Sequence, residues 1–292
     1  MPTFPGFEHI VREQEPLAPH TWFRLGGPAE YFAEPTRVEE LTELLAHCQQ
    51  ANLSVRLLGG GSRVLVPDEG VSGLVIQLSA PAFSTIEVNA PTIRVGGGAK
   101  LGHLVSAAVG AGLAGLENLV GIPGSVAGAL RGNAHNQGSS IGQWITSARL
   151  INREGKPLDR QRDEMRFSYG ESSLHELVLL DATFELEPGN VGDLTRRMQK
   201  SWIVRKSSEP SAHNGIGRIF KDAQGMTAAE LIEQAGLRGE SVGQARVSDT
   251  CANFIQVGPG ATASDVGQLV ETMRNKVAST LGISLECELE IW

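Results

Sequence analysis

Clusters of glycine restrict the folding of this chain more than any other feature of its sequence. The chain has 35 glycines in 292 residues, roughly 12% against a usual ~7%, and they follow no collagen-like period. Two clusters stand out: Gly59-Gly60-Gly61-Ser62, directly after a predicted strand, and residues 121–129, GIPGSVAGA. Glycines in such turns let successive backbone N–H groups point into one concavity that binds an anion. The alternative is that both clusters are tight turns between strands.

Composition excludes several classes of protein. The net charge is −8 and the pI is about 5.4, which argues against a general binder of nucleic acid or membrane surfaces, with a local basic cleft left open. Three scattered cysteines form neither a disulfide framework nor a zinc motif, so we expect a reducing compartment and no metal. The N-terminus lacks the pattern of a signal peptide, and no apolar run approaches ~18 residues. We therefore expect a cytoplasmic protein without nucleic-acid or membrane partners.

Hydrophobic periodicity predicts an α+β protein. Thr36 and Glu39 have the spacing of a capping box, and apolar residues follow on one helical face up to Cys48. A second capping box joins Thr227 and Glu230. Further helices are expected over 101–111, 194–202 and 266–281, and strands over 55–58, 71–78, 93–95, 148–152, 177–186 and 283–291. Residues 115–142 are too rich in glycine for a regular helix.

A Pro-Gly-Asn turn at residues 188–190 is the best domain boundary. It predicts one region over 1–190, in two parts divided near residue 80, and a smaller helix–strand domain over 191–292. The usual phosphate motifs are absent: neither glycine cluster reads G-x-G-x-x-G, and there is no G-x-x-x-x-G-K-[ST] or H-E-x-x-H. A Rossmann protein, a P-loop protein and a zincin are all disfavoured.

Several segments of the chain match the motifs of one known family. Residues 21–29, TWFRLGGPA, are similar to N-T-[FW]-x-[IL]-G-G-x-A, and Gly59 to Ser62 are similar to a G-x-G-S turn. Residues 115–129, GLENLVGIPGSVAGA, resemble the highly specific G-x-E-x-x-x-G-I-P-G-[ST]-x-G-G-A. Shorter matches continue in the same order to the C-terminus at Phe220-Lys221, 229–239, 252–254 and 285–288. Through these motifs the chain resembles the UDP-N-acetylenolpyruvoylglucosamine reductase family, in its compact subtype.

This resemblance implies a two-part FAD-binding domain of the p-cresol-methylhydroxylase type, followed by a substrate-binding domain. It implies non-covalent FAD, with NADPH as co-substrate, and reduction of UDP-N-acetylglucosamine enolpyruvate to UDP-N-acetylmuramate in peptidoglycan synthesis. In the family, NADPH reduces FAD, and N5 of the flavin then delivers hydride to the enolpyruvyl double bond. The residues implied to hold the FAD diphosphate are Gly59, Gly60, Gly61, Ser62, Gly121, Ile122, Pro123, Gly124, Ser125 and Gly128.

The expected catalytic residues match the family only in part. The family's Y-R-x-S reads Tyr169-Gly170-Glu171-Ser172, so the arginine that holds the substrate carboxylate is replaced by glycine. The serine of G-S-x-F-K, which protonates the intermediate, is replaced by Arg218. Glu288, on the predicted last strand, keeps its identity. We predict that Arg218 takes over the carboxylate, because a guanidinium grips a carboxylate with two nitrogens, and that the proton comes from Glu288, Tyr169 or a water.

For each of these residues, an explanation without a role in catalysis stays open. Glu288 can belong to a solvated row of glutamates, Tyr169 can be a surface aromatic, and Arg218 can point to solvent. Lys221, Arg205 and Asn253 are predicted to contact the substrate, although Arg205 also suits the end of a helix. Because two expected residues are missing, a flavin-binding paralogue with weak or altered catalysis and a structural protein that keeps the fold are alternative functions. The sequence leaves the oligomeric state open.

Overall fold

The computed structural model describes residues 4–210, 215–223 and 225–292, and these fall into two compact units. The first unit comprises residues 1–14, 30–60 and 72–204. The second comprises residues 15–29, 61–71 and 205–292. Among the described residues, no helix has the length and apolar character needed to cross a membrane.

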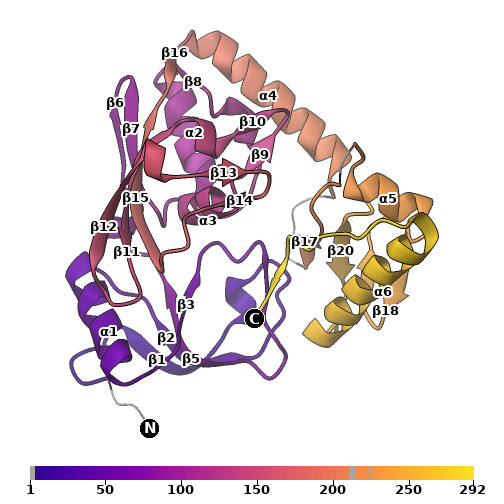
Figure 1. Ribbon diagram of the computed structural model, residues 1–292, viewed down its shortest axis with the longest axis horizontal. Helices are drawn as coiled ribbons and strands as arrows, with labels where there is room; N and C mark the ends of the chain where they lie inside the picture. Colours follow the sequence, from indigo (N-terminus) through magenta and orange to yellow (C-terminus); the bar gives the residue numbers. More distant parts are fainter. Residues whose placement is uncertain (1–3, 211–214, 224) are drawn as a thin grey trace. The chain divides into compact units, whose positions relative to one another are not determined.

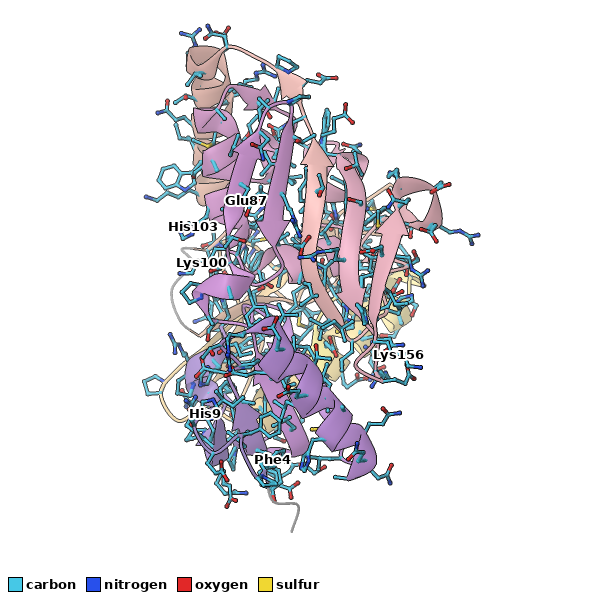
Figure 2. The ribbon with its side chains drawn as sticks, turned by 90° about the vertical axis from the view of Figure 1, so that its left-hand side faces the viewer. Phe4, His9, Glu87, Lys100, His103 and Lys156 are labelled. Carbon is cyan, nitrogen blue, oxygen red and sulfur yellow. The ribbon has the colours of Figure 1, made fainter. Side chains whose placement is uncertain are left out.

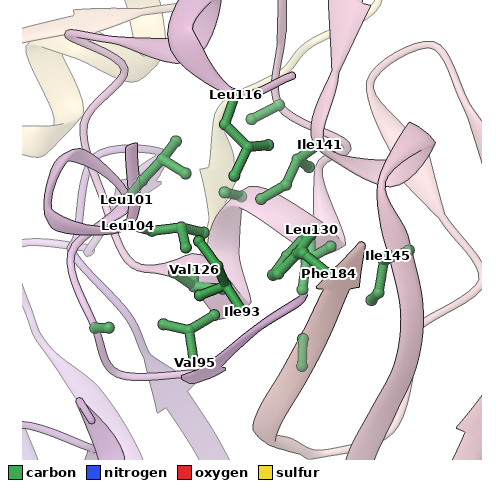
Figure 3. Close-up of a cluster of buried hydrophobic side chains, with 14 of the residues drawn as sticks. Ile93, Val95, Leu101, Leu104, Leu116, Val126, Leu130, Ile141, Ile145 and Phe184 are labelled. Atoms are coloured by element: carbon green, nitrogen blue, oxygen red, sulfur yellow. The ribbon is translucent and has the colours of Figure 1, made fainter. Parts of the chain in front are cut away.

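A five-stranded sheet forms one half of the first unit, with strand order β12-β11-β15-β7-β6. The helices α2 and α3 cover one face of this sheet (Figure 1). Figure 3 shows the core between them, where Ile93 and Val95 of β7 meet Leu101 and Leu104 of α2. The bounds are β6 Ile86–Asn89, β7 Thr92–Gly96, α2 Leu101–Gly110, α3 Val126–Arg131, β11 Ile145–Ile151, β12 Pro157–Gln161 and β15 Val178–Glu185.

A four-stranded sheet, mostly within the first unit, has strand order β1-β2-β5-β3 and packs against α1. Phe4 and His9 lie near this helix (Figure 2), and the Phe4 ring contacts Tyr31 and His47. Strands β3 and β5 are parallel, with Val55 opposite Leu74. The bounds are β1 Val11–Pro16, β2 Pro28–Ala33, α1 Val38–Gln50, β3 Val55–Leu58 and β5 Val71–Gln77.

Short elements complete the first unit. The long helix α4 (Val191–Ser208) begins in this unit and ends in the second, to which its last turn with Arg205 and Lys206 belongs. Two-residue strands form small pairs: β8 (Leu113–Ala114) with β16 (Glu187–Pro188), β9 (His135–Asn136) with β10 (Ser139–Ser140), and β13 (Phe167–Ser168) with β14 (Glu171–Ser172).

The second unit is built around a four-stranded antiparallel sheet, β17-β20-β19-β18, whose core also takes in α5 and α6. A second, parallel pair joins β4 to β21 near the C-terminus. The bounds are β4 Val64–Leu65, β17 Ile216–Arg218, α5 Ala228–Gln234, β18 Ser241–Val242, β19 Ala245–Val247, β20 Phe254–Val257, α6 Ala263–Leu281 and β21 Glu290–Ile291.

Most predicted elements are present, and four predictions differ from the structure. The expected strand over 283–291 is wrong, because only Glu290–Ile291 pairs as a strand and the preceding residues attach singly to residues 219–221. Residues 115–142 do contain a regular helix, the short α3, which begins just after the Gly-Ile-Pro-Gly turn. The compact units divide at Val204 and Arg205 rather than at residue 190, because α4 continues across the predicted boundary and residues 15–29 and 61–71 pack with the C-terminal unit.

The predicted capping box of α1 is also wrong in its partner. Thr36 donates from its backbone N and its Oγ1 to the carboxylate of Glu40, at 2.8 and 2.7 Å, while Glu39 is exposed. Arg37 and His9 lie at 2.9 and 3.3 Å from the same carboxylate. Hydrogen bonds from Thr36, Arg37 and His9 lower the pKa of Glu40 to about 2. Glu40 thus anchors the start of the helix.

Replacing Glu40 by glutamine should therefore destabilise the protein by about 1–3 kcal/mol at neutral pH, the usual value for hydrogen bonds to a charged group. Since the pKa of Glu40 is lower in the folded chain, wild-type stability should fall as pH drops from 4.5 toward about 2, where the folded carboxylate is protonated. Urea unfolding across this range measures the effect, and Glu40→Gln should weaken the pH dependence. The control Glu39→Gln should unfold like wild type; equal losses in both variants would contradict this role of Glu40.

Candidate functional site

The two glycine clusters meet within the first unit. Gly59 and Gly60 follow the carboxyl end of β3, and Gly124 and Ser125 precede α3. A Cβ atom on Gly60 would lie 2.6 Å from Cα of Gly124, and one on Gly59 would lie 2.8 Å from Oγ of Ser125. Any side chain at Gly60 would therefore push the two turns apart. The glycines at these two positions are explained by this close approach of one backbone to the other.

Part of the backbone of these two adjoining glycine turns is exposed to solvent. Gly59, Gly60, Gly121 and Gly128 are all exposed, and a Cβ on Gly128 would find only Oγ of Ser125, at 3.5 Å. Ser125 is the N-cap of α3, where its Oγ accepts from the backbone N of Gly128 at 3.3 Å. Bare peptide groups of this kind fit a diphosphate, which needs N–H donors and no bulky side chains around it.

Buried contacts hold the second turn in place. Glu117, just before it, accepts from the backbone N of Gly115 at 2.7 Å and from Arg197 of α4 at 3.0 Å. Gly124 accepts from the backbone N of Leu101 at 3.0 Å, which ties the turn to α2. Ile122 packs on the core of the same unit, and Pro123 is half-buried beside it. The turn is therefore fixed before any ligand arrives.

Gly61 and Ser62 belong to the second unit. Gly61 has a φ of +64° and packs against the backbone of His20 and Thr21, while its carbonyl accepts from the backbone N of Trp22 at 3.0 Å. The neighbouring Phe23 is buried, and its ring fills the space that a Cβ on Gly217 would need. The TWFRLGG segment thus connects the end of the first glycine turn to the strand that carries Arg218.

A cluster of charged side chains in the second unit gathers around Glu288. One carboxylate oxygen of Glu288, Oε1, lies 2.6 Å from Nη2 of Arg63, and the other, Oε2, lies 3.2 Å from Nε of Arg218. Nη2 of Arg218 also lies 3.3 Å from Asp222. The side chain of Glu288 is 5% exposed, whereas that of Glu286 is 71% exposed. Glu288 therefore does not belong to a solvated row of glutamates.

Backbone contacts fix Glu288 from two sides. Its own N donates to the carbonyl of Ile219 at 2.7 Å, next to Arg218, and the N of Glu290 donates to the carbonyl of Arg63 at 2.8 Å. Arg218 itself lies on β17, opposite Phe254 of β20. The main chain therefore brings Arg63, Arg218 and Glu288 together independently of their charges.

Arg205 and Glu209 form a second ion pair close to this cluster, with 2.9 Å between Nη2 and Oε2. Burial raises the pKa of Glu209, opposed by the positive charges of Arg205 and Arg218. Burial likewise lowers the pKa of Arg205, and the charges of Arg218 and Arg63 add to this effect. Arg205 is thus a partly buried cation near the Glu288 cluster, and it also lies in the last turn of α4.

Tyr169 and Gly170 form the turn of the β13–β14 hairpin in the first unit, where Ser168 pairs with Glu171. The side chain of Tyr169 is 47% exposed, and its ring centroid lies 4.4 Å from that of His135. Gly170 has a φ of +72°, a conformation that an arginine would adopt only with strain. The glycine at the family's arginine position therefore suits the tight turn that this chain forms.

The remaining predicted residues have partners within the second unit. The ammonium of Lys221 pairs with the carboxylate of Glu286. Asn253 is buried. Its Oδ1 accepts a hydrogen bond from the backbone N of Phe220 at 2.9 Å, and its Nδ2 donates one to the carbonyl of Phe220 at 2.7 Å. Asn253 thus has a structural role beside Lys221, and its contact with substrate stays a prediction.

Arg63 is the residue that sequence reasoning missed. The sequence feature that could have identified it is its position, directly after Gly61 and Ser62 and directly before β4. A cation at the end of an expected anion-binding turn is a candidate for the same site. Its pairing with Glu288, 225 residues further along the chain (288 − 63), depends on the parallel contact of β4 with β21.

Comparison with known proteins agrees with this arrangement. Two family models match: an FAD binding domain over residues 29–159, and the C-terminal domain of UDP-N-acetylenolpyruvoylglucosamine reductase over residues 209–292. The enzyme of that name from Rhodopirellula baltica is 40% identical over 97% of this chain and 93% of its own length. One from Symbiobacterium thermophilum is 38% identical over 97% of this chain and 92% of its own.

A solved structure agrees as well. The crystal structure of UDP-N-acetylenolpyruvylglucosamine reductase from Thermus caldophilus matches with a TM-score of 0.83 and 32% identity, covering 97% of this chain and 99% of that one. The match runs through the glycine turns and the Glu288 cluster alike, since it spans nearly the whole of both chains. This chain therefore belongs to the UDP-N-acetylenolpyruvoylglucosamine reductase family.

Proposed function

We propose that this protein is an FAD-dependent oxidoreductase that reduces UDP-N-acetylglucosamine enolpyruvate to UDP-N-acetylmuramate with NADPH, in peptidoglycan synthesis. The observation that carries the proposal is the 40% identity to a reductase of this family over nearly the full length of both chains. Gly128 supports it, because this glycine is exposed and a Cβ there would meet only Oγ of Ser125 at 3.5 Å, so packing alone does not require glycine at this position. We place the reaction in the cytoplasm, without nucleic-acid or membrane partners.

The first part of the mechanism is binding of the cofactor. Backbone N–H groups of Gly59, Gly60 and residues 121–125 would hold the FAD diphosphate, and we assign Gly61, Ser62 and Gly128 to the same site. When bound, FAD supplies a hydride carrier between NADPH and the enolpyruvyl double bond. We assign cofactor binding to residues 1–190 and substrate binding to residues 191–292, a functional division that differs from the compact units, which divide at Val204 and Arg205.

The second part is control of charge at the substrate. Hydride addition to the enolpyruvyl group leaves negative charge that spreads onto its carboxylate, so cations near that carboxylate lower the barrier. Arg218 supplies such a cation, and its Nε lies 3.2 Å from Oε2 of Glu288, which provides the counter-charge. A proton must then reach the adjacent carbon from Glu288, Tyr169 or a bound water, because guanidinium is a poor acid near neutral pH. Lys221, Arg205 and Asn253 are the remaining residues that we assign to substrate binding.

Two half-reactions test the function. The purified protein should be yellow, NADPH should bleach it under anaerobic conditions, and the enolpyruvyl sugar nucleotide should then restore the colour. A colourless protein would support a structural role. Bleaching without recovery would support a flavin-binding paralogue that lacks this activity.

We expect Arg218→Ala to raise the KM for the enolpyruvyl substrate and to slow flavin reoxidation by about 10- to 100-fold, the loss of a charge-assisted hydrogen bond. Arg218→Lys should restore only part of this loss, because lysine lacks the planar fork. Stopped-flow measurement of reoxidation checks the result. An unchanged KM and an unchanged reoxidation rate would mean that Arg218 does not bind the carboxylate.

A further inference from the structure

Arg63 has the geometry of a second cation at the substrate site. Its Nη2 lies 2.6 Å from Oε1 of Glu288, while Arg218 faces the other oxygen of the same carboxylate at 3.2 Å. Arg218 also faces Asp222 at 3.3 Å, whereas the ion pair of Arg63 is with Glu288, the carboxylate that it shares with Arg218. A substrate anion beside Arg63 would add to this shared counter-charge.

The position of Arg63 is rigid. Gly61, two residues before it, is buried against the backbone of His20 and Thr21, and the carbonyl of Arg63 accepts from the backbone N of Glu290. The contacts of Glu288 with Ile219 fix the other end of the pair. A guanidinium held in this way loses little conformational entropy when it binds a ligand.

Arg63 also keeps capacity for a further partner. A guanidinium carries five N–H donors, and the contact with Glu288 involves Nη2. Glu288 is 5% exposed, whereas the side chain of Arg63 is 35% exposed. The carboxylate is thus enclosed while the cation reaches solvent, so Glu288 can orient Arg63 without covering it.

We propose that Arg63 binds the enolpyruvyl carboxylate of the substrate beside Arg218, and that Glu288 is the positioning residue that holds both guanidiniums. This inference rests on the proposed function. It explains how a chain with glycine in place of the family's arginine at position 170 can bind the substrate carboxylate. The cation is then supplied by Arg63, at the end of the first glycine turn. The ligand is defined by its chemistry, a carboxylate next to a double bond that gains negative charge during reduction.

The test separates binding of the carboxylate from binding of the rest of the nucleotide. Arg63→Ala should raise the KM for the enolpyruvyl substrate and slow flavin reoxidation by about 10- to 100-fold. Flavin reduction by NADPH should stay near the wild-type rate. Affinity for UDP-N-acetylglucosamine, which lacks the carboxylate, should stay unchanged. Arg238→Ala is the matched control, because Arg238 lies in the same unit, is 46% exposed and pairs with the carboxylate of Glu233.

Arg63→Lys guards against a folding defect, since it keeps a positive charge beside Glu288. We expect it to raise the KM by several-fold, because an ammonium cannot contact two carboxylates with a planar fork. A wild-type KM in Arg63→Lys or Arg63→Ala would overturn the inference, and so would an equal loss of affinity for UDP-N-acetylglucosamine. If the wild-type protein itself failed to reoxidise, the proposed function would fall first.

Discussion

Gly124→Val should yield a protein that binds almost no FAD. Gly124 has a φ of +111°, where a β-branched residue is strongly disfavoured. Its Cα also forms the surface on which Gly60 rests, since a Cβ on Gly60 would lie 2.6 Å away from it. The valine would distort the joined turns and fill the space assigned to the diphosphate. Flavin absorbance per mole of purified protein, with and without added FAD, measures the effect.

The matched control is Gly102→Val on α2, in the same unit. A Cβ on Gly102 would meet no heavy atom within 4 Å, and valine is a better helix former than glycine, so this variant should fold and keep its flavin. Loss of flavin in both variants would indicate general destabilisation. Full flavin occupancy in Gly124→Val would refute the placement of the diphosphate at these turns.

The sequence predicted elements best where one periodic face meets one core. The apolar residues of α1 and α6 recur at helical spacing, and the structure buries them as expected. The segment after α6 misled the same reasoning. Leu285 and Leu289 alternate as in a strand and are buried, but Ile291 is 53% exposed and most of the segment contacts other chain segments singly. Alternation of apolar and polar residues indicates which side chains are buried, but not which backbone groups form hydrogen bonds. It therefore cannot distinguish a strand from an irregular buried segment.

Particular side-chain and backbone contacts could not be predicted for a related reason. The start of α1 is held by Glu40 rather than Glu39, because the carboxylate of Glu40 reaches both donors of Thr36. Residues 61–71 pack with the C-terminal unit through pairing of β4 with β21. Neither local spacing nor composition encodes such pairing, and the burial of Glu288 follows from it.

Glu288→Gln should separate the two half-reactions. Glutamine keeps the shape of glutamate but removes the charge that faces Arg63 at 2.6 Å and Arg218 at 3.2 Å. Two guanidiniums without their counter-charge repel each other, so both lose their orientation toward a substrate carboxylate. Flavin reduction by NADPH should remain nearly intact, while reoxidation by the enolpyruvyl sugar nucleotide should slow by about 100-fold or more. Anaerobic stopped-flow absorbance follows each step separately.

Glu290→Gln provides the comparison, because Glu290 lies two residues further along the chain and is exposed. It should reduce and reoxidise its flavin at wild-type rates. A reoxidation rate in Glu288→Gln equal to that of Glu290→Gln would remove Glu288 from the site. If Glu288→Gln lost both half-reactions equally, the cause would be a folding defect, because the carboxylate is buried between two cations that its removal leaves uncompensated. Selective loss of reoxidation is the outcome that a role at the substrate requires.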